Sequence, residues 1–443
     1  MRVEDVHLGL DDIDSPKGGC TTHFASMVVQ YLSDMKVDWN DYPNLIRLNP
    51  GIPFRTRGNG AVALRFKVST SKLNLLMRWI KQNIEDYVDR DYPNTNPGVV
   101  IVKGEIPTEI KKFSERALWR TIPIAFAKRI ITELNLDSYS VGNGRGLIGA
   151  LSAIGNCLEK DHTFEYIAYR PLEEANLSRG VDRNSVIEMD KIMGEEVFAN
   201  IDESNRVLIE PHGPDPVLYG IRGETPETVI KAAGYVRSKQ SVNSWMVFRT
   251  NQGTGEHLTH HVRINDLRPY MAAIVRGVVI DGPRMIEGGH VIFSISDETS
   301  KIDCASYEPT QKLRMIVKEL RQGDKVNILA SVRPMSRTHG LTLNIEGLEI
   351  LQLAEIMHQL NPICPHCLKR MKSAGKNKGY KCISCGYRDP LAQKINTPVK
   401  RNIRPGLYLP PLTAQRHLTR SNSRLNKHNE GIPDDLVTIW HSH

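Results

Sequence analysis

Long uninterrupted apolar runs are absent from this 443-residue chain. No stretch approaches the ~18–20 consecutive apolar residues that a membrane-spanning helix needs. The N-terminal segment MRVEDVHLGLDDID carries acids where a secretory signal peptide would have its apolar core. Seven cysteines, of which four cluster and three are scattered, do not form the framework of a disulfide-rich secreted domain. We therefore expect a cytoplasmic protein that does not associate with a membrane.

Acidic residues are scarce in one part of the chain only. The formal net charge is +8, and between Cys364 and Lys427 there are 15 lysines and arginines against a single acid, Asp389. The first 363 residues are correspondingly close to neutral. A concentrated basic segment favours polyanionic partners, of which nucleic acid is the leading candidate. The alternative is a solubilising tail, but the cysteines and aromatic residues in the same segment argue against it.

The length and the apolar fraction of 40% predict a multidomain α+β protein. Turn signals and changes in hydrophobic periodicity divide the chain into five parts. These are an α/β unit at 1–135, a small α+β unit of ferredoxin-like pattern at 136–262, a barrel at 263–355, a zinc ribbon with a basic tail at 356–427, and a flexible end at 428–443.

The barrel is predicted from five alternating strands with a helix after the third. The strands are expected at 272–280, 290–297, 300–306, 325–333 and 340–351, and the helix at 310–321. This is the order of an OB-fold, a barrel that commonly binds single-stranded nucleic acid. A purely structural barrel is the alternative.

Two cysteine pairs predict a metal site. Cys364 and Cys367 form one CxxC, and Cys382 and Cys385 form a second after fourteen residues. Each pair can direct two thiolates at one ion, and two pairs complete a tetrahedron around structural zinc. Four cysteine ligands leave no open position for zinc catalysis. A redox dithiol or an iron–sulfur site is the alternative.

Acidic residues and a glycine turn follow the first predicted strand. Asp11, Asp12 and Asp14 stand at its carboxyl end, where α/β sheets place their chemistry. Carboxylates this dense favour a hard cation, and magnesium with a nucleoside triphosphate is the natural guest. The next residues offer backbone N–H groups, a lysine and hydroxyls to phosphate: Ser15, Lys17, Gly18, Gly19, Cys20, Thr21 and Thr22. An acidic surface turn before an ordinary helix is the alternative.

Two further segments have ambiguous patterns. Asn143-Gly144-Arg145-Gly146 is similar to half a phosphate loop, and the simple start of a helix explains it equally well. Arg55, Arg57 and Asn59 fit either anion contacts or loop structure.

Taken together, these segments resemble one family, the archaeal isoleucine-tRNA agmatinylcytidine synthetases. The resemblance is carried in one order by GLDDIDSPKGGCTTHFA, RLNPGIPFRTRGNGAV, GNGRGLIGALSAIG, FRTNQGTGEHL, ICPHC with KCISCGY, and RPGLYLPPLTAQRHL, so it covers the chain to about residue 420. It implies a kinase-like N-terminal domain, a ferredoxin-like domain, an OB-fold and a zinc ribbon.

The resemblance also implies a reaction. ATP activates the C2 carbonyl of the wobble cytidine in the isoleucine tRNA with a CAU anticodon, agmatine displaces the phosphate, and decoding changes from AUG to AUA. AMP and pyrophosphate are released. The cofactors would be ATP, magnesium and structural zinc, and the partners that tRNA and agmatine.

The resemblance assigns roles to individual residues. Asp11, Asp12 and Asp14 would hold magnesium and phosphates, and Thr21 would be phosphorylated, with Thr22 as the alternative. Lys17, Gly18 and Gly19 would line the triphosphate. The chain departs from the family's pattern at Ile13, where threonine is common, and at Gly19, where a bulkier residue is common. These departures place the fine geometry of the loop in doubt.

The chemistry adds one expectation, and two other functional classes compete with the ligase. Because agmatine is a dication, its pocket should contain acids and aromatic rings, and Glu210–Asp215 with Tyr219 is the candidate. The main rival is a non-catalytic OB-fold and zinc-ribbon protein that binds nucleic acid. A phosphotransferase acting on a small molecule is a third reading. The acidic and glycine-rich loop argues against the first rival, and the barrel with the ribbon argues against the second.

Overall fold

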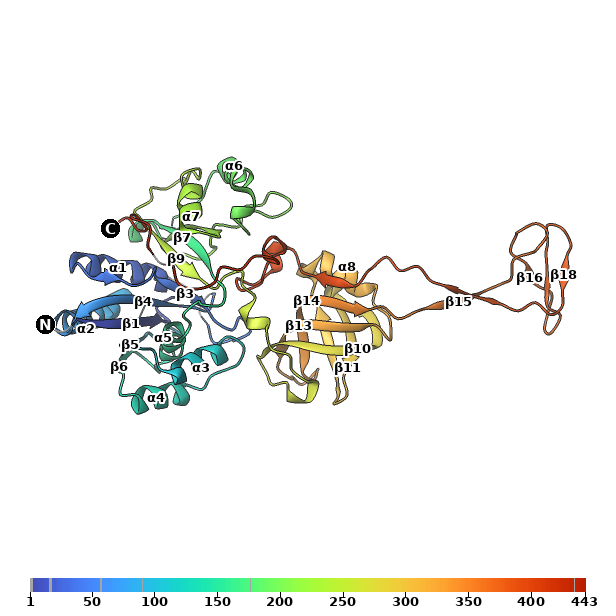
Figure 1. Ribbon diagram of the computed structural model, residues 1–443, viewed down its shortest axis with the longest axis horizontal. Coiled ribbons are helices and arrows are strands. Elements are labelled where there is room, and N and C mark those ends of the chain that lie inside the picture. The colour runs from blue at the N-terminus through green and yellow to red at the C-terminus, as the bar shows by residue number, and fades with distance from the viewer. Residues whose placement is uncertain (1–2, 16–17, 56–57, 90, 176, 434) are drawn as a thin grey trace.

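The structure is a computed structural model that describes residues 3–15, 18–55, 58–89, 91–175, 177–433 and 435–443 (Figure 1). Within these residues the N-terminal half is built on one nine-stranded sheet, in the order β6-β5-β1-β4-β3-β9-β7-β8 with β2 paired to β4. The strands are β1 (Val3–Asp11), β2 (Asp38–Trp39), β3 (Asn44–Arg47), β4 (Gly60–Ser69), β5 (Gly98–Lys103), β6 (Asp137–Ser140), β7 (Thr163–Tyr169), β8 (Val217–Gly223) and β9 (Ser244–Thr250).

The sheet continues across the two units that the sequence separates at residue 135. The parallel pairing of β3 with β9, Asn44 opposite Arg249, joins the two halves. Strand β6 pairs with β5, and α5 (Gly146–Gly155) packs on β1, β4 and β5. Both elements therefore lie with the first half of the sheet, although the sequence-based division assigned them to the second. The pattern of a single segment does not reveal a pairing between distant strands, which is why the division missed it.

Helices cover both faces of the sheet. α1 (Thr21–Asp34) and α2 (Thr70–Tyr87) contribute to one buried cluster, and α3 (Thr108–Ala117), α4 (Ile124–Glu133) and α5 contribute to another on the opposite face. α6 (Arg183–Met193) and α7 (Pro226–Ala233) cover the β7–β9 end. α3 and α4 are separate helices, because Pro123 disfavours helical backbone in the residue before it. Residues 206–209 form no strand and contribute one isolated bridge, between Ile201 and Val207.

The predicted five-stranded barrel is confirmed. β10 (Ala272–Met285), β11 (Val291–Ser296), β12 (Lys301–Ser306), β13 (Lys325–Arg333) and β14 (Thr342–Gln352) form it, and a parallel pairing of β12 with β14 closes it. α8 (Lys312–Lys318) lies between the third and fourth strands, as predicted. No helix in the described part of the chain is long and apolar enough to cross a membrane.

A two-stranded arm carries the zinc-ribbon segment away from the barrel (Figure 1). β15 (Met357–Leu360) pairs with β19 (Ile395–Pro398), and the small sheet of β16 (Lys372–Ser373), β17 (Tyr380–Lys381) and β18 (Arg388–Asp389) lies at its tip. The chain then returns, and β20 (Gly406–Tyr408) pairs with β14.

The last residues pack against the main body, which corrects the expectation of a flexible end at 428–443. Trp440 is 4% exposed and contacts the rings of Trp39 and Tyr42. Its carbonyl accepts a hydrogen bond from the N–H of Val247 in β9. The N–H of Val437 also donates to the hydroxyl of Tyr42 at 2.7 Å, so the segment has several contacts with distant residues that the sequence did not reveal.

Candidate functional site

A cavity of about 800 Å³ lies where the two halves of the sheet meet the returning C-terminal chain. Its walls hold most of the predicted acidic and hydroxyl residues of the first loop, namely Asp11, Asp12, Asp14, Cys20, Thr21 and Thr22. Ser15, Gly18 and Gly19 lie in the adjoining turn and are not part of the lining. Lys17 lies outside the described residues.

Asp12 is held in a strained and fully bonded position. Its φ of 59° lies in the left-handed region, which is unusual for a residue with a side chain. Arg145 donates to both carboxylate oxygens, from Nη2 to Oδ2 at 2.9 Å and to Oδ1 at 3.2 Å. The backbone N–H of Asn96 donates to Oδ2 at 3.2 Å. Such strain at a cavity wall is a feature of functional sites.

Asp14 and Thr21 form a carboxylate–hydroxyl pair. Thr21 Oγ1 donates to Asp14 Oδ2 at 2.6 Å and accepts from the N–H of Ile13 at 3.3 Å. Thr22 bonds instead to the thiol of Cys20, with 3.0 Å between Oγ1 and Sγ. Both threonines lie in the first turn of α1, where unpaired helical N–H groups favour anions.

The glycine turn is a tight backbone loop. The N–H of Ser15 donates to the carbonyl of Gly18 at 3.1 Å, and the Ser15 hydroxyl donates to the same oxygen at 2.7 Å. Gly18 and Gly19 both have positive φ, 151° and 77°, which only glycine adopts readily. The N–H of Cys20 donates to the hydroxyl of Tyr87, so α2 fixes the start of α1.

Asp11, at the end of β1, packs closely against α5. Burial and the neighbouring Asp12 carboxylate raise the pKa of Asp11 well above its usual range. A Cβ on Gly149 would lie 1.9 Å from Asp11 Oδ2, so only glycine fits there. The glycines of the segment GNGRGLIGALSAIG thus allow close contact of α5 with β1. The sequence left open whether residues 143–146 are a phosphate loop or the start of a helix. In the structure α5 begins at Gly146, and the arginine of this segment, Arg145, forms an ion pair with Asp12.

Arginines from distant segments supply the positive charge of the cavity. Its lining includes Arg47, Arg55, Arg120, Arg145, Arg222 and Arg416. His417 lies among them, and Arg47, burial and Arg222 together lower its pKa well below its usual range, which keeps the ring neutral. Sequence reasoning singled out Arg55. Arg47, Arg416 and His417 lie in segments quoted for the family resemblance but were given no role of their own, and Arg222 lies in no such segment.

The segment proposed for agmatine also lines the cavity. Glu210 and Asp215 are both in the wall, and Arg179 pairs with Asp215 at 3.1 Å. Glu210 Oε1 accepts from the N–H of Val181 at 2.7 Å. Tyr219, in contrast, is 3% exposed and stacks on Tyr166 in the core, so the expectation that it belongs to the pocket is wrong.

The four cysteines of the ribbon converge. The sulfur atoms of Cys364, Cys367, Cys382 and Cys385 lie within 4.8 Å of one another. Gly386, which follows the second pair, has a φ of 81° that lets the knuckle close, and its N–H donates to the carbonyl of Cys382 at 3.0 Å. Four thiolates at this spacing fit tetrahedral zinc. His366 packs edge-on against Tyr387 and is outside the cysteine cluster.

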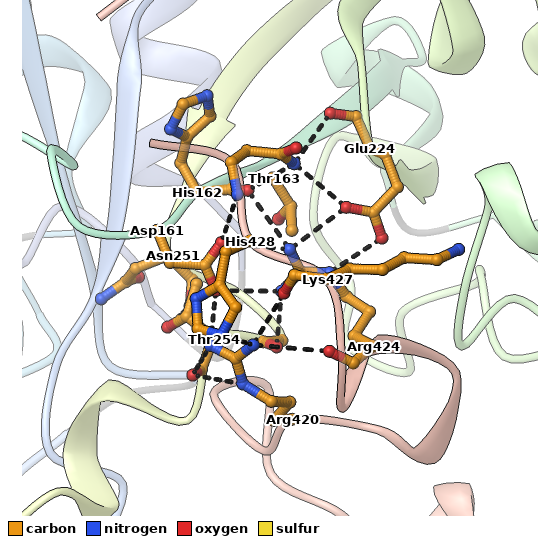
Figure 2. A network of polar contacts seen from close by, with 12 residues as sticks. Asp161, His162, Thr163, Glu224, Asn251, Thr254, Arg420, Arg424, Lys427 and His428 are labelled. Atoms are coloured by element: carbon orange, nitrogen blue, oxygen red, sulfur yellow. Dashed lines mark hydrogen bonds and ion pairs between the residues drawn. The ribbon is translucent and has the colours of Figure 1, made fainter. Parts of the chain in front are cut away.

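Part of the basic tail has a structural role, which corrects the expectation that all of its charges serve to bind nucleic acid. Arg424 is fully buried and pairs with Asp161 and Glu224 (Figure 2). Arg420 pairs with Asp161 at 2.6 Å, and Arg401 pairs with Asp324 at 2.5 Å. Their acidic partners are more than 70 residues away in sequence, so charge counting could not find them.

Family models match three parts of the chain. Residues 7–143 match the TiaS TCKD domain, residues 144–257 the TiaS FLD domain, and residues 361–403 the TiaS C-terminal zinc ribbon domain.

Curated relatives cover the whole length. The chain is 43% identical to the isoleucine-tRNA 2-agmatinylcytidine synthetase TiaS of Staphylothermus marinus, over 100% of this chain and 99% of the relative. It is 40% identical to the same enzyme of Methanosarcina mazei, over 93% and 96%. A crystal structure of apo TiaS superimposes with a TM-score of 0.86 at 37% identity, covering 96% of this chain and 98% of that one. A complex of TiaS with its isoleucine tRNA, AMPCPP and agmatine superimposes with a TM-score of 0.81 at 35% identity, covering 97% and 99%.

Proposed function

We propose, because the chain belongs to the isoleucine-tRNA 2-agmatinylcytidine synthetase (TiaS) family, that it is an ATP-dependent ligase acting on the isoleucine tRNA with a CAU anticodon. It conjugates agmatine to C2 of the wobble cytidine, which changes decoding from AUG to AUA. One observation carries this proposal: a single cavity holds an aspartate cluster, a threonine at a helix N-terminus and a set of arginines. A nucleic-acid binder without catalysis has no use for that combination.

The parts of the chain divide the task. The first half of the sheet is the kinase-like unit that binds ATP, the second half is the ferredoxin-like unit, the barrel is an OB-fold that contacts RNA, and the ribbon is a structural zinc module. The enzyme acts in the cytoplasm, where its tRNA is found. The wobble base leaves the anticodon stack to reach the cavity, as in other enzymes that modify bases.

The acidic cluster fits a magnesium ion with bound triphosphate. Asp11 and Asp14 offer carboxylate oxygens, the ligands that magnesium prefers. Burial, and after it the neighbouring Asp12 carboxylate, raise the pKa of Asp11, and a bound cation would favour its charged form. When bound, the ion neutralises charge on the phosphates. Asp12 holds Arg145 at the same wall, so that a guanidinium lies beside the phosphates.

Thr21 is the favoured phosphoryl acceptor. Its hydroxyl is already bonded to the carboxylate of Asp14 at 2.6 Å, and a nucleophile next to a base has the arrangement that proton removal needs. Thr22 bonds to a thiol, which is the poorer base at neutral pH. The residues of the glycine turn, Ser15, Gly18 and Gly19 with Cys20, direct backbone N–H groups of α1 toward the phosphates.

Glu210 is the carboxylate proposed to bind a cationic end of agmatine. Asp215 lines the same wall, but Arg179 already neutralises it at 3.1 Å. Glu210 accepts the backbone N–H of Val181 and lines the cavity, and within the described residues no lysine or arginine forms an ion pair with it. A carboxylate is the preferred partner of a guanidinium.

The direct test is mass spectrometry of the wobble nucleoside after incubation with ATP, agmatine and the tRNA transcript. A mass gain equal to agmatine minus water, dependent on both small molecules, is the expected result. The matched control is a transcript in which guanosine or uridine replaces the wobble cytidine, and it stays unmodified. Unmodified cytidine in the complete reaction, with the tRNA bound, would favour the non-catalytic binder instead.

A further inference from the structure

One segment of the sequence has no role in the proposed chemistry, the run FRTNQGTGEHL at Phe248–Leu258. Its two glycines, Gly253 and Gly255, have φ values of 72° and 73°. Each gives its N–H to the returning C-terminal chain: Gly253 donates to the carbonyl of His417 at 2.9 Å, and Gly255 to that of Leu418 at 2.7 Å. The loop is therefore a receptor for a segment more than 160 residues later in the chain.

That later segment, Leu412–Ser421, is called the strap here. It forms one wall of the cavity, which it enters with Arg416 and His417. Leu418 of the strap is 1% exposed, so the strap packs on the body. His417 Nδ1 accepts from Arg222 at 3.4 Å, which links the strap to β8.

A buried ion-pair cluster closes the end of the strap. This clasp consists of Asp161, Glu224, Arg420, Arg424 and Asn429 (Figure 2). Arg424 donates to Glu224 at 2.8 Å, to Asp161 at 3.2 Å, and to the carbonyl of Gly253 at 2.7 Å. Gly253 therefore donates its N–H to His417 and accepts a hydrogen bond from Arg424 at its carbonyl. The clasp and the strap meet at the same glycine.

The charges of the clasp balance, which explains its burial. Two arginines meet two carboxylates, and Asn429 donates to Glu224 Oε2 at 3.0 Å while its N–H donates to Asp161 Oδ1 at 3.0 Å. Removal of one partner leaves a buried charge without compensation, so the cluster tolerates only the seated arrangement. The strap therefore has one fixed position relative to the cavity.

We infer that Arg420 and Arg424 are positioning residues: they hold the strap in the 251–255 loop so that Arg416 and His417 complete a polyphosphate-binding wall of the cavity. The inference rests on the proposed nucleotide-binding function of that cavity. Arg416 supplies a guanidinium to the phosphates, and the neutral ring of His417 orients Arg222 beside it. Neither arginine of the clasp needs to touch the nucleotide.

The test is equilibrium binding of AMPCPP to the full chain without tRNA, for Arg416→Ala, Arg424→Gln and the double variant. We expect Arg416→Ala to weaken binding about tenfold, the value of one charge-assisted hydrogen bond. Arg424→Gln should weaken it to a similar degree. Since both act through Arg416, the double variant should lose little more than either single variant. Arg424→Lys, which keeps the charge but not the fork, should recover part of the affinity.

Controls separate this inference from a general loss of fold. Arg401→Gln removes another buried ion pair of the tail, with Asp324 at the base of the arm, and should leave AMPCPP affinity unchanged. If Arg424→Gln shows no cooperative thermal transition, Arg420→Gln replaces it, because its side chain is 17% exposed at the edge of the clasp. Wild-type affinity in the clasp variant, or losses that multiply to about a hundredfold in the double variant, would overturn the inference. If the wild-type chain does not bind AMPCPP, the proposed function fails first.

Discussion

The contact between Gly149 and Asp11 gives a sharp test of the active-site assignment. A Cβ at position 149 would lie 1.9 Å from Asp11 Oδ2 and 2.4 Å from its Cγ. Ordinary contact needs about 3.5 Å, so the carboxylate has to retreat by roughly 1.5 Å or α5 has to lift from β1. The change Gly149→Ala therefore moves a proposed metal-binding group without removing it.

The magnitude follows from that displacement. Overpacking of this kind costs about 1–3 kcal/mol of the free energy of unfolding. A 1 Å misplacement of a reacting group costs about a hundredfold in rate, so we expect AMP production to fall by at least that factor while the protein stays folded. The assay measures AMP release with ATP, agmatine and the tRNA transcript, together with thermal denaturation of each variant.

Two glycines provide the comparison. Gly146→Ala places its Cβ 2.4 Å from the backbone nitrogen of Gly98, so it opposes backbone rather than a side chain and should cost more stability. Gly282→Ala in β10 meets nothing within 4 Å and should change stability by less than about 0.5 kcal/mol. Wild-type AMP production by a folded Gly149→Ala variant refutes the proposal that Asp11 binds magnesium at the active site.

Three further outcomes are expected. Asp12→Ala abolishes ATP turnover and leaves tRNA binding largely intact, measured by AMP release and by a filter-binding assay; unchanged AMP production contradicts the proposed chemistry. Cys382→Ala loses bound zinc in elemental analysis and weakens tRNA binding, and metal retained at full stoichiometry contradicts the four-cysteine site. Burial lowers the pKa of both His23 and His162 to about 4, so below pH 6.5 the unfolded chain takes up protons that the folded chain does not, and the thermal midpoint falls between pH 6.5 and 4; a flat midpoint contradicts their burial as neutral rings.

Local patterns predicted the parts of this fold whose causes are local. The barrel strands alternate apolar and polar residues, and the zinc knuckles repeat a fixed spacing, so both could be read from the sequence. The loop after β1 was predicted as a site because three carboxylates stand next to a turn, and the structure adds the pairing of Thr21 with Asp14.

The parts that could not be predicted depend on contacts between distant segments. Arg145 belongs to a motif that suggests phosphate binding, and only the fold shows that its partner is Asp12, 133 residues earlier. Arg424 lies in a strongly basic run, where each charge suggests a polyanion, but its partners Asp161 and Glu224 are more than 190 residues away. The continuous sheet across residue 135 has the same origin, since the paired residues of β3 and β9, Asn44 and Arg249, are 205 positions apart.

The basic segment therefore contains two groups of cations with different roles, which a count of charges does not distinguish. Eight of its cations, from Lys369 to Lys394, lie exposed on the ribbon at the end of the arm, with Asp389 as the only acid among them. Arg420 and Arg424, further along the chain, pair with Asp161 and Glu224 of the body. Between the two groups stand the Arg401–Asp324 ion pair and the pairing of β20 with β14. These anchors fix the chain to the barrel before it reaches the cavity, so the contacts that hold the strap are separate from the ribbon.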